Sequence, residues 1–129
     1  MKDKKILGVD FGKSKIGLAL AEHGLVSTLV VLRKRQNFVK DVCRIAKEEK
    51  ADMIVVGVSD AQAGKEARDF GRIVERISNL RVDYQDETLT TKDALDKMIE
   101  AGKGRKYRRE KEDLFAAALI LEIYCQENV

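Results

Sequence analysis

The chain has 129 residues and a formal net charge of +3, and 36% of its residues are charged, against about 25% in an average soluble protein. This length predicts one domain spanning residues 1–129, with no room for a two-lobed kinase or synthetase. The longest apolar run, 114–121, is far shorter than the ~20 residues that cross a bilayer. No secretory signal is evident, and the two cysteines are too few for a disulfide framework, so we expect a cytoplasmic protein with no membrane partner.

The first part of the chain predicts three strands, a helix and a fourth strand. Short, β-branched apolar runs at 6–10, 15–21 and 25–32 are separated by turns, which is typical of an antiparallel meander. Apolar residues at helical spacing follow over 38–46. The run 52–57 is again strand-like.

The second part alternates helices with one more strand. The spacing of apolar residues predicts a helix over 67–77, after a loop that contains Gly64, and then a short strand at 80–84. Another helix opens at Thr90 and is ended by nearby glycines. The last helix, 110–126, is apolar on nearly all sides and therefore buried. This order predicts a mixed α/β sheet, antiparallel first and then parallel with helical crossovers.

Three acidic residues stand at the ends of apolar elements. Asp10 closes the first strand, Glu87 follows the fifth strand, and Asp113 lies in the first turn of the last helix. Each alone is more simply explained as a turn or helix-dipole acid. A mixed sheet brings such strand ends together, where folds of this kind place ligands. Converging carboxylates repel unless a cation neutralises them, and oxygen ligands select hard ions such as Mg²⁺ or Mn²⁺.

A second feature is a basic block at 103–111, which has six basic residues and one acidic residue, a net +5 that leaves −2 on the other 120 residues. A local cationic block on a near-neutral body is typical of a surface that binds a polyanion. A solvated loop and helix start is the alternative explanation. The residues expected to contact nucleic acid here are Lys103, Arg105, Lys106, Tyr107, Arg108 and Arg109, of which Tyr107 is the one aromatic placed to touch a base.

Four segments in this order resemble the YqgF/RuvX family: ILGVDFGKSKIGLAL at 6–20, ADMIVVGV at 51–58, DETLTTKDAL at 86–95 and DLFAAALILEIY at 113–124. The resemblance implies a ribonuclease H-like, mixed five-stranded sheet with helices on both faces. It also implies a metal-dependent hydrolase: a nuclease of the two-metal-ion type that matures the 5′ end of pre-16S ribosomal RNA. The family's metal site maps onto Asp10, Glu87 and Asp113. Alternatives are a Holliday-junction-resolvase-like enzyme that cuts branched DNA, and an RNA-binding factor of the same fold that has lost catalysis.

The chain departs from the family pattern at two places. The arginine that usually follows the Asp–Glu pair is Thr88, which removes a candidate clamp for phosphate. The segment 58–64 differs from the family's usual Leu-Pro and Asn-x-x-Gly sequence. Both departures concern substrate contacts and efficiency rather than the predicted metal ligands.

The turn after Asp10 has its own signal. Gly12 allows a tight turn and a close approach of backbone to phosphate, and Lys13 and Lys15 are expected to contact nucleic acid beside it. Gly17 is equally well explained as a packing position. The same pattern resembles the first phosphate motif of actin-like ATPases, but 129 residues leave no second lobe for such an enzyme.

Overall fold

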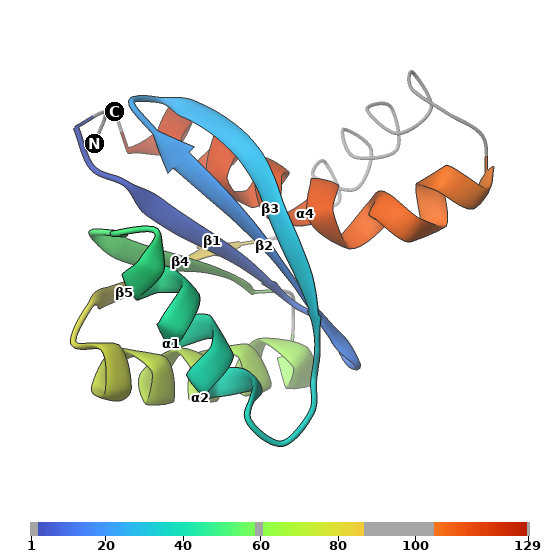
Figure 1. The fold of residues 1–129 in the computed structure, drawn as a ribbon, viewed down its shortest axis with the longest axis horizontal. Coiled ribbons are helices and arrows are strands. Elements are labelled where there is room, and N and C mark those ends of the chain that lie inside the picture. Colours follow the sequence, from blue (N-terminus) through green and yellow to red (C-terminus); the bar gives the residue numbers. More distant parts are fainter. Residues whose placement is uncertain (1–2, 59–60, 87–104, 129) are drawn as a thin grey trace.

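The computed structural model describes residues 3–58, 61–86 and 105–128, and it describes the backbone alone for 61–63 and 105–113. Figure 1 shows how the elements are arranged. In chain order they are β1 (Ile6–Phe11), β2 (Lys15–Glu22), β3 (Leu25–Arg33), α1 (Phe38–Glu48), β4 (Met53–Val58), α2 (Ala61–Ser78), β5 (Arg81–Asp86) and α4 (Arg105–Glu127). The order predicted from the sequence is confirmed for these elements, and the helix expected to open at Thr90 lies outside the described residues.

The strands form one mixed sheet in the order β3-β2-β1-β4-β5. β1, β2 and β3 pair antiparallel, whereas β4 pairs parallel with both β1 and β5. In Figure 1, α1 and α2 lie below the sheet and α4 crosses its other side. The sheet predicted from the sequence, with helices on both faces, is therefore confirmed.

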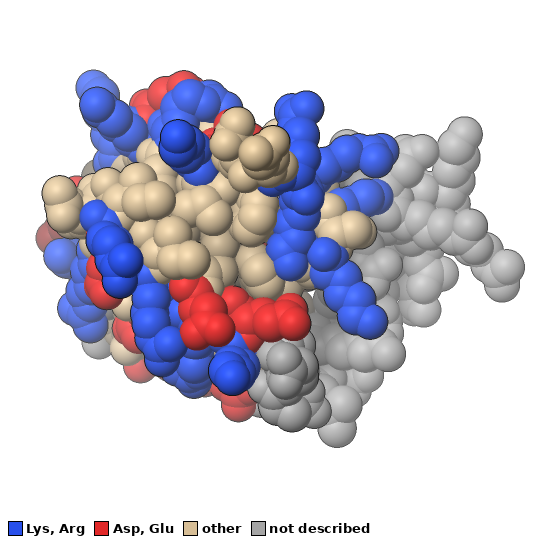
Figure 2. All heavy atoms as spheres, turned by 90° about the horizontal axis from the view of Figure 1, so that it is seen from below, with Lys and Arg blue, Asp and Glu red and all other residues tan. Residues whose placement is uncertain are grey.

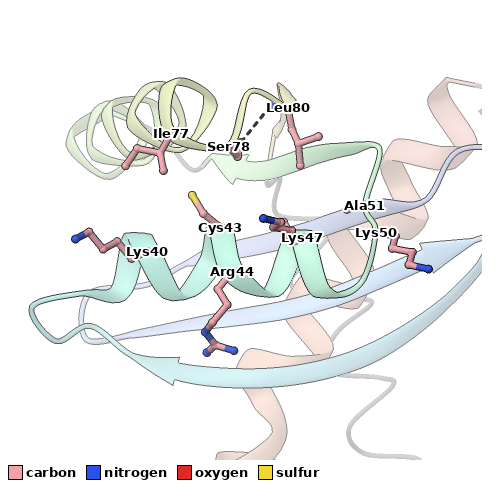
Figure 3. Close-up of a pocket in the computed structure, with 10 residues that line it drawn as sticks. Lys40, Cys43, Arg44, Lys47, Lys50, Ala51, Ile77, Ser78 and Leu80 are labelled. Carbon is pink, nitrogen blue, oxygen red and sulfur yellow. Dashed lines mark hydrogen bonds between the residues drawn. The ribbon is translucent and has the colours of Figure 1, made fainter.

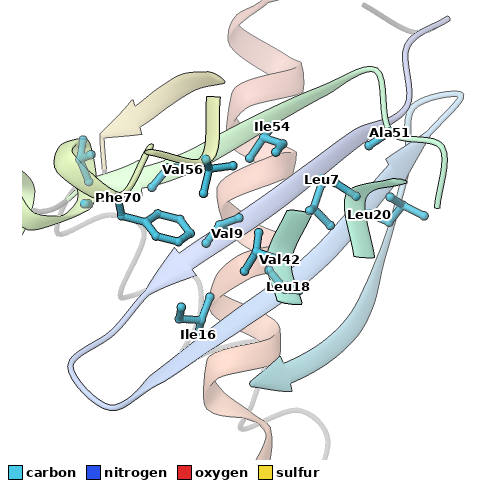
Figure 4. Packing of buried hydrophobic residues seen from close by; sticks show 14 residues of the cluster. Leu7, Val9, Ile16, Leu18, Leu20, Val42, Ala51, Ile54, Val56 and Phe70 are labelled. Carbon is cyan, nitrogen blue, oxygen red and sulfur yellow. The ribbon is translucent and has the colours of Figure 1, made fainter. Parts of the chain in front are cut away.

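Alternation along the strands divides the core between the two faces. Leu7 and Val9 of β1 are fully buried in a cluster with α1 and α2, whose packing Figure 4 shows. Ile6 is buried in a second cluster, with α4. Because residues two apart in a strand share a face, Gly8 and Asp10 lie on the α4 face with Ile6.

Gly8 allows α4 to approach the sheet closely. A Cβ atom added at Gly8 would overlap Cγ of Leu121 and lie 2.8 Å from its Cδ1, closer than real Cβ atoms come to a neighbour. We therefore expect Gly8→Ala to destabilise the protein by about 1–3 kcal/mol, the usual cost of over-packing a core. The measurement is the shift of the urea unfolding midpoint at constant m-value.

A second substitution shows whether this contact is the cause. Leu121→Ala alone should cost about 2–5 kcal/mol, because it opens a cavity under α4. In the double variant the new methyl group occupies part of that cavity, so the loss of stability should be smaller than the sum of the two single losses. Simple additivity would contradict the close packing of α4 on β1.

Two helices begin earlier than predicted. α2 begins at Ala61 rather than near residue 67, so Gly64 lies in a helix and the expected loop is absent there. α4 begins at Arg105 rather than near residue 110, so the basic stretch 105–111 is helical and Asp113 lies in the third turn, not the first. The prediction followed apolar spacing, which starts only where a helix touches the sheet, whereas alanine, lysine and arginine extend a helix beyond that contact. None of the helices in the described ranges is long and apolar enough to cross a membrane.

Candidate active site at the strand ends

Asp10 lies near the end of β1 between two glycines. It pairs in register with Gly17 of β2 on one side and with Gly57 of β4 on the other. Paired residues of neighbouring strands project from the same face, so no side chain from either flanking position stands beside the Asp10 carboxylate. Asp10 itself is half-buried. The sequence left the role of Gly17 open, and the register places it at the candidate site.

The line of paired residues that contains Asp10 and Gly57 continues across the sheet to Gln85. Gly57 pairs with Gln85 of β5, whose side chain is only 7% exposed and donates a hydrogen bond from Nε2 to the carbonyl oxygen of Asp86 at 3.3 Å. Sequence reasoning missed Gln85 because it ended this strand at Tyr84. The available signal was the alternation of Arg81, Asp83 and Gln85, which marks a polar face on this strand.

A buried hydrogen bond ties α4 to β5. The Tyr124 hydroxyl donates to Oδ2 of Asp83 at 2.7 Å, and Tyr124 is 2% exposed. Burial first, and then this hydrogen bond, raises the pKa of Tyr124 to about 12, so the phenol stays protonated at neutral pH. The bond fixes α4 relative to the strand whose end leads towards Glu87 in the sequence.

The structure describes the three predicted acids to different extents. Asp10 lies on the face that α4 covers, and Asp113 belongs to α4, although its side chain is not described. Glu87 lies outside the described residues. Within the described residues, no group of three His, Cys, Asp or Glu could hold a metal ion. Convergence of the three carboxylates remains a prediction.

The turn that follows β1 needs a glycine. The Gly12 amide donates to the carbonyl oxygen of Lys15 at 3.0 Å, and a Cβ at Gly12 would lie 2.8 Å from that oxygen. Lys13 and Lys15 are both exposed at this turn. The tight turn is confirmed, and contact of Gly12 with a phosphate stays a prediction.

The other predicted nucleic-acid contacts lie at the start of α4. Arg105, Lys106, Tyr107, Arg108 and Arg109 occupy its first turns, where the backbone alone is described, and Lys103 lies outside the described residues. In Figure 1 this end of α4 is at the upper right and the β1–β2 turn is at the lower right. The backbone of 105–109 and the β1–β2 turn therefore lie at different places in the fold.

A groove on the opposite side of the sheet lies between α1 and α2 (Figure 3). Its volume is about 660 Å³, and Lys40, Cys43, Arg44, Lys47, Ile77 and Leu80 are among the residues that line it. It contains no acid and no hydrogen-bonded polar cluster that suggests catalysis. Because it is separated from Asp10 by the sheet, it is not part of the candidate site.

Comparison with known proteins gives a consistent result. A family model described as RuvX, Holliday junction resolvase, matches residues 4–127. A protein of Clostridium botulinum (strain Alaska E43 / Type E3), named "Putative pre-16S rRNA nuclease", is 33% identical over 130 residues, covering 93% of this chain and 95% of its own. A protein of that name from Thermosynechococcus vestitus is 33% identical over 127 residues, covering 91% and 84%.

Solved structures share the fold. T. thermophilus RuvC, in complex with a Holliday junction substrate, matches with a TM-score of 0.66 and 14% identity, over 98% of this chain and 97% of RuvC. At this identity the likeness concerns the fold alone. It confirms the ribonuclease H-like sheet expected from the sequence.

Proposed function

Because this chain belongs to the RuvX family, we propose that it is a metal-dependent nuclease that hydrolyses phosphodiester bonds in structured nucleic acid, with the 5′ end of pre-16S ribosomal RNA as its substrate. The observation that supports this best is the position of Asp10, between two glycines on the face that α4 covers. Glycines at both flanking positions put no side chain of β2 or β4 beside Asp10, which suits a site that a cation and a phosphate must both approach. Such a substrate places the protein in the cytoplasm.

We assign the metal-binding role to Asp10, Glu87 and Asp113. The donor chemistry fits, because carboxylate oxygens prefer Mg²⁺ or Mn²⁺, and the single histidine, His23, is in the turn at the other end of β2. When bound, a pair of such ions supplies an activated water and stabilises the leaving oxygen of an in-line displacement. In this proposal Asp10, Glu87 and Asp113 would hold these ions. Tyr124 positions α4, and with it Asp113, through Asp83.

We assign binding of the nucleic-acid backbone to two groups of residues. One is Gly12, Lys13 and Lys15 at the β1–β2 turn. The other consists of Lys103, Arg105, Lys106, Tyr107, Arg108 and Arg109. Contacts of lysine and arginine with phosphates hold a strand without reading its sequence, and they weaken as salt rises. This role suits a nuclease that recognises the shape of its substrate.

The test is a cleavage assay on a 5′-labelled pre-16S transcript with Mn²⁺, with Mg²⁺ and with EDTA. We expect cleavage near the mature 5′ end with either ion and none with EDTA. A four-way DNA junction and a single-stranded RNA serve as competing substrates in the same assay. Cleavage of the junction alone would replace the RNA substrate by branched DNA, and tight RNA binding with no cleavage would favour a non-catalytic RNA-binding factor.

A further inference from the structure

The open end of the β2–β3 hairpin carries two arginines that are not among the nucleic-acid contacts predicted from the sequence. Arg33 is the last residue of β3, and Arg35 lies two residues beyond it; both are exposed. We propose that Arg33 and Arg35, together with Lys15, form a phosphate-binding surface for the substrate strand next to Asp10. This inference rests on the proposed function, because it concerns the same substrate.

The register places Arg33 on the same face as Asp10. Lys15 pairs with Arg33, and Lys15 is two residues from Gly17, the partner of Asp10. Alternation keeps Lys15 and Gly17 on the α4 face, and paired residues share a face. From the usual spacing of residues and strands, the Cα atoms of Arg33 and Asp10 are about 12 Å apart. One strand that passes Asp10 could therefore also contact Arg33.

The arrangement is unfavourable for the sheet alone. Lys15 and Arg33 stand directly opposite each other, and like charges in that position destabilise a strand pair. The only acid between residues 11 and 40 is Glu22, at the far end of β2. Real proteins depart from such local rules mainly at functional sites. A bound phosphate would remove the repulsion that the fold leaves in place.

Several other exposed cations of the described residues are paired, unlike these. Arg44 contacts Glu48 at 2.8 Å, Arg72 contacts Asp69 at 2.9 Å, and Arg81 contacts Asp83 at 3.8 Å. Within the described residues, Arg33 and Arg35 make no ion pair. Figure 2, seen from the side on which α1 and α2 lie, shows Lys and Arg side chains at several places around the described surface, with Asp and Glu side chains among them.

Lys34 is excluded from the proposed surface by its own contact. Its Nζ lies 3.7 Å from the centroid of the Phe11 ring, a cation–π contact. Phe11 packs against the cluster formed with α1 and α2, so Lys34 serves the opposite face. Arginine also suits the proposed role, because its planar guanidinium binds phosphate oxygens in pairs.

The experiment compares Arg33→Gln/Arg35→Gln with the control Lys47→Gln/Arg76→Gln, which removes the same charge from the ends of α1 and α2. Binding of a fluorescent 20-base-pair RNA duplex is measured at several salt concentrations, with every protein carrying Asp10→Asn to prevent cleavage. We expect the slope of log affinity against log salt to flatten by about 1.4–1.8 in the first variant, at roughly 0.7–0.9 per lost contact. The control should keep the slope of its parent.

Thermal unfolding gives a second readout, in which the variant is expected to lose no stability although it binds nucleic acid less tightly. If Arg33 binds substrate rather than supporting the sheet, Arg33→Gln should unfold at the same temperature as the wild type or higher, because a like-charge pair is lost. An unchanged salt slope, or a lower melting temperature together with a slope change matched by the control, overturns the phosphate-binding surface. Failure of the proposed function is a different result, namely a wild-type protein that cuts no nucleic acid or an Asp10→Asn variant that still cuts it.

Discussion

We expect Asp10→Asn to lower RNA cleavage at least about a hundredfold while the protein stays folded. Loss of one carboxylate from a metal site removes ~3 kcal/mol or more of transition-state stabilisation, and each 1.36 kcal/mol is about tenfold in rate. Asparagine has nearly the same size, and removing one charge from converging acids relieves their repulsion, so the melting temperature should hold or rise. Single-turnover cleavage and circular dichroism melting measure the two effects.

A metal titration separates a ligand from a structural residue. Mn²⁺ should raise the melting temperature of the wild type, because an ion that binds only the folded state stabilises it, and this rise should be much smaller in Asp10→Asn. Asp69→Asn is the matched control, since Asp69 pairs with Arg72 on α2, away from the candidate site. If Asp10→Asn unfolds the protein instead, Asp10 is chiefly a structural acceptor and the proposed metal site loses its central residue.

The second large effect concerns the space beside Asp10. We expect Gly57→Val to reduce cleavage at least about tenfold, or about 1.4 kcal/mol, because a branched side chain would stand next to the carboxylate on the same face. Valine is favourable in a strand, so the sheet should form normally. The measurement is cleavage rate together with the Mn²⁺-dependent rise in melting temperature.

Side-chain size gives a graded comparison. Gly57→Ala should lie between the wild type and Gly57→Val in cleavage rate, and all three should melt within a few degrees of one another. A variant that is inactive because it misfolds would show a lower melting temperature without Mn²⁺. Full activity in Gly57→Val would mean that neither the ion nor the phosphate occupies the space over Gly57, beside Asp10.

The sequence was sufficient for the sheet because each strand is a short apolar run with a clear boundary. The run 6–10 ends in an acid, Asp10. Alternation places Asp10 on the face of the sheet opposite to that of Leu7 and Val9. The predicted start of α4 was wrong because charged residues extend the helix beyond the apolar region that contacts the sheet. Apolar periodicity marks where a helix packs rather than where it begins.

Other features depend on pairing between distant segments, which one strand or helix does not reveal. Only the strand register, which pairs Gly17 with Asp10, shows that Gly17 lies at the candidate site. The hydrogen bond between Tyr124 and Asp83 joins residues 41 positions apart. The metal-binding roles of Asp10, Glu87 and Asp113 stay predictions.

The place of α4 in the chain has a consequence for synthesis on the ribosome. Its buried residues cover one face of a sheet whose central strand, β1, leaves the ribosome first. Until α4 emerges, Ile6, Ala19 and Val55 have no partner from it, and nascent chains with such exposed apolar surface are prone to aggregate. The proposed ligand Asp113 arrives with that same helix. In the proposed site, the metal ligands are therefore complete only after α4 has packed on the sheet, so the same step would close the core and complete the site.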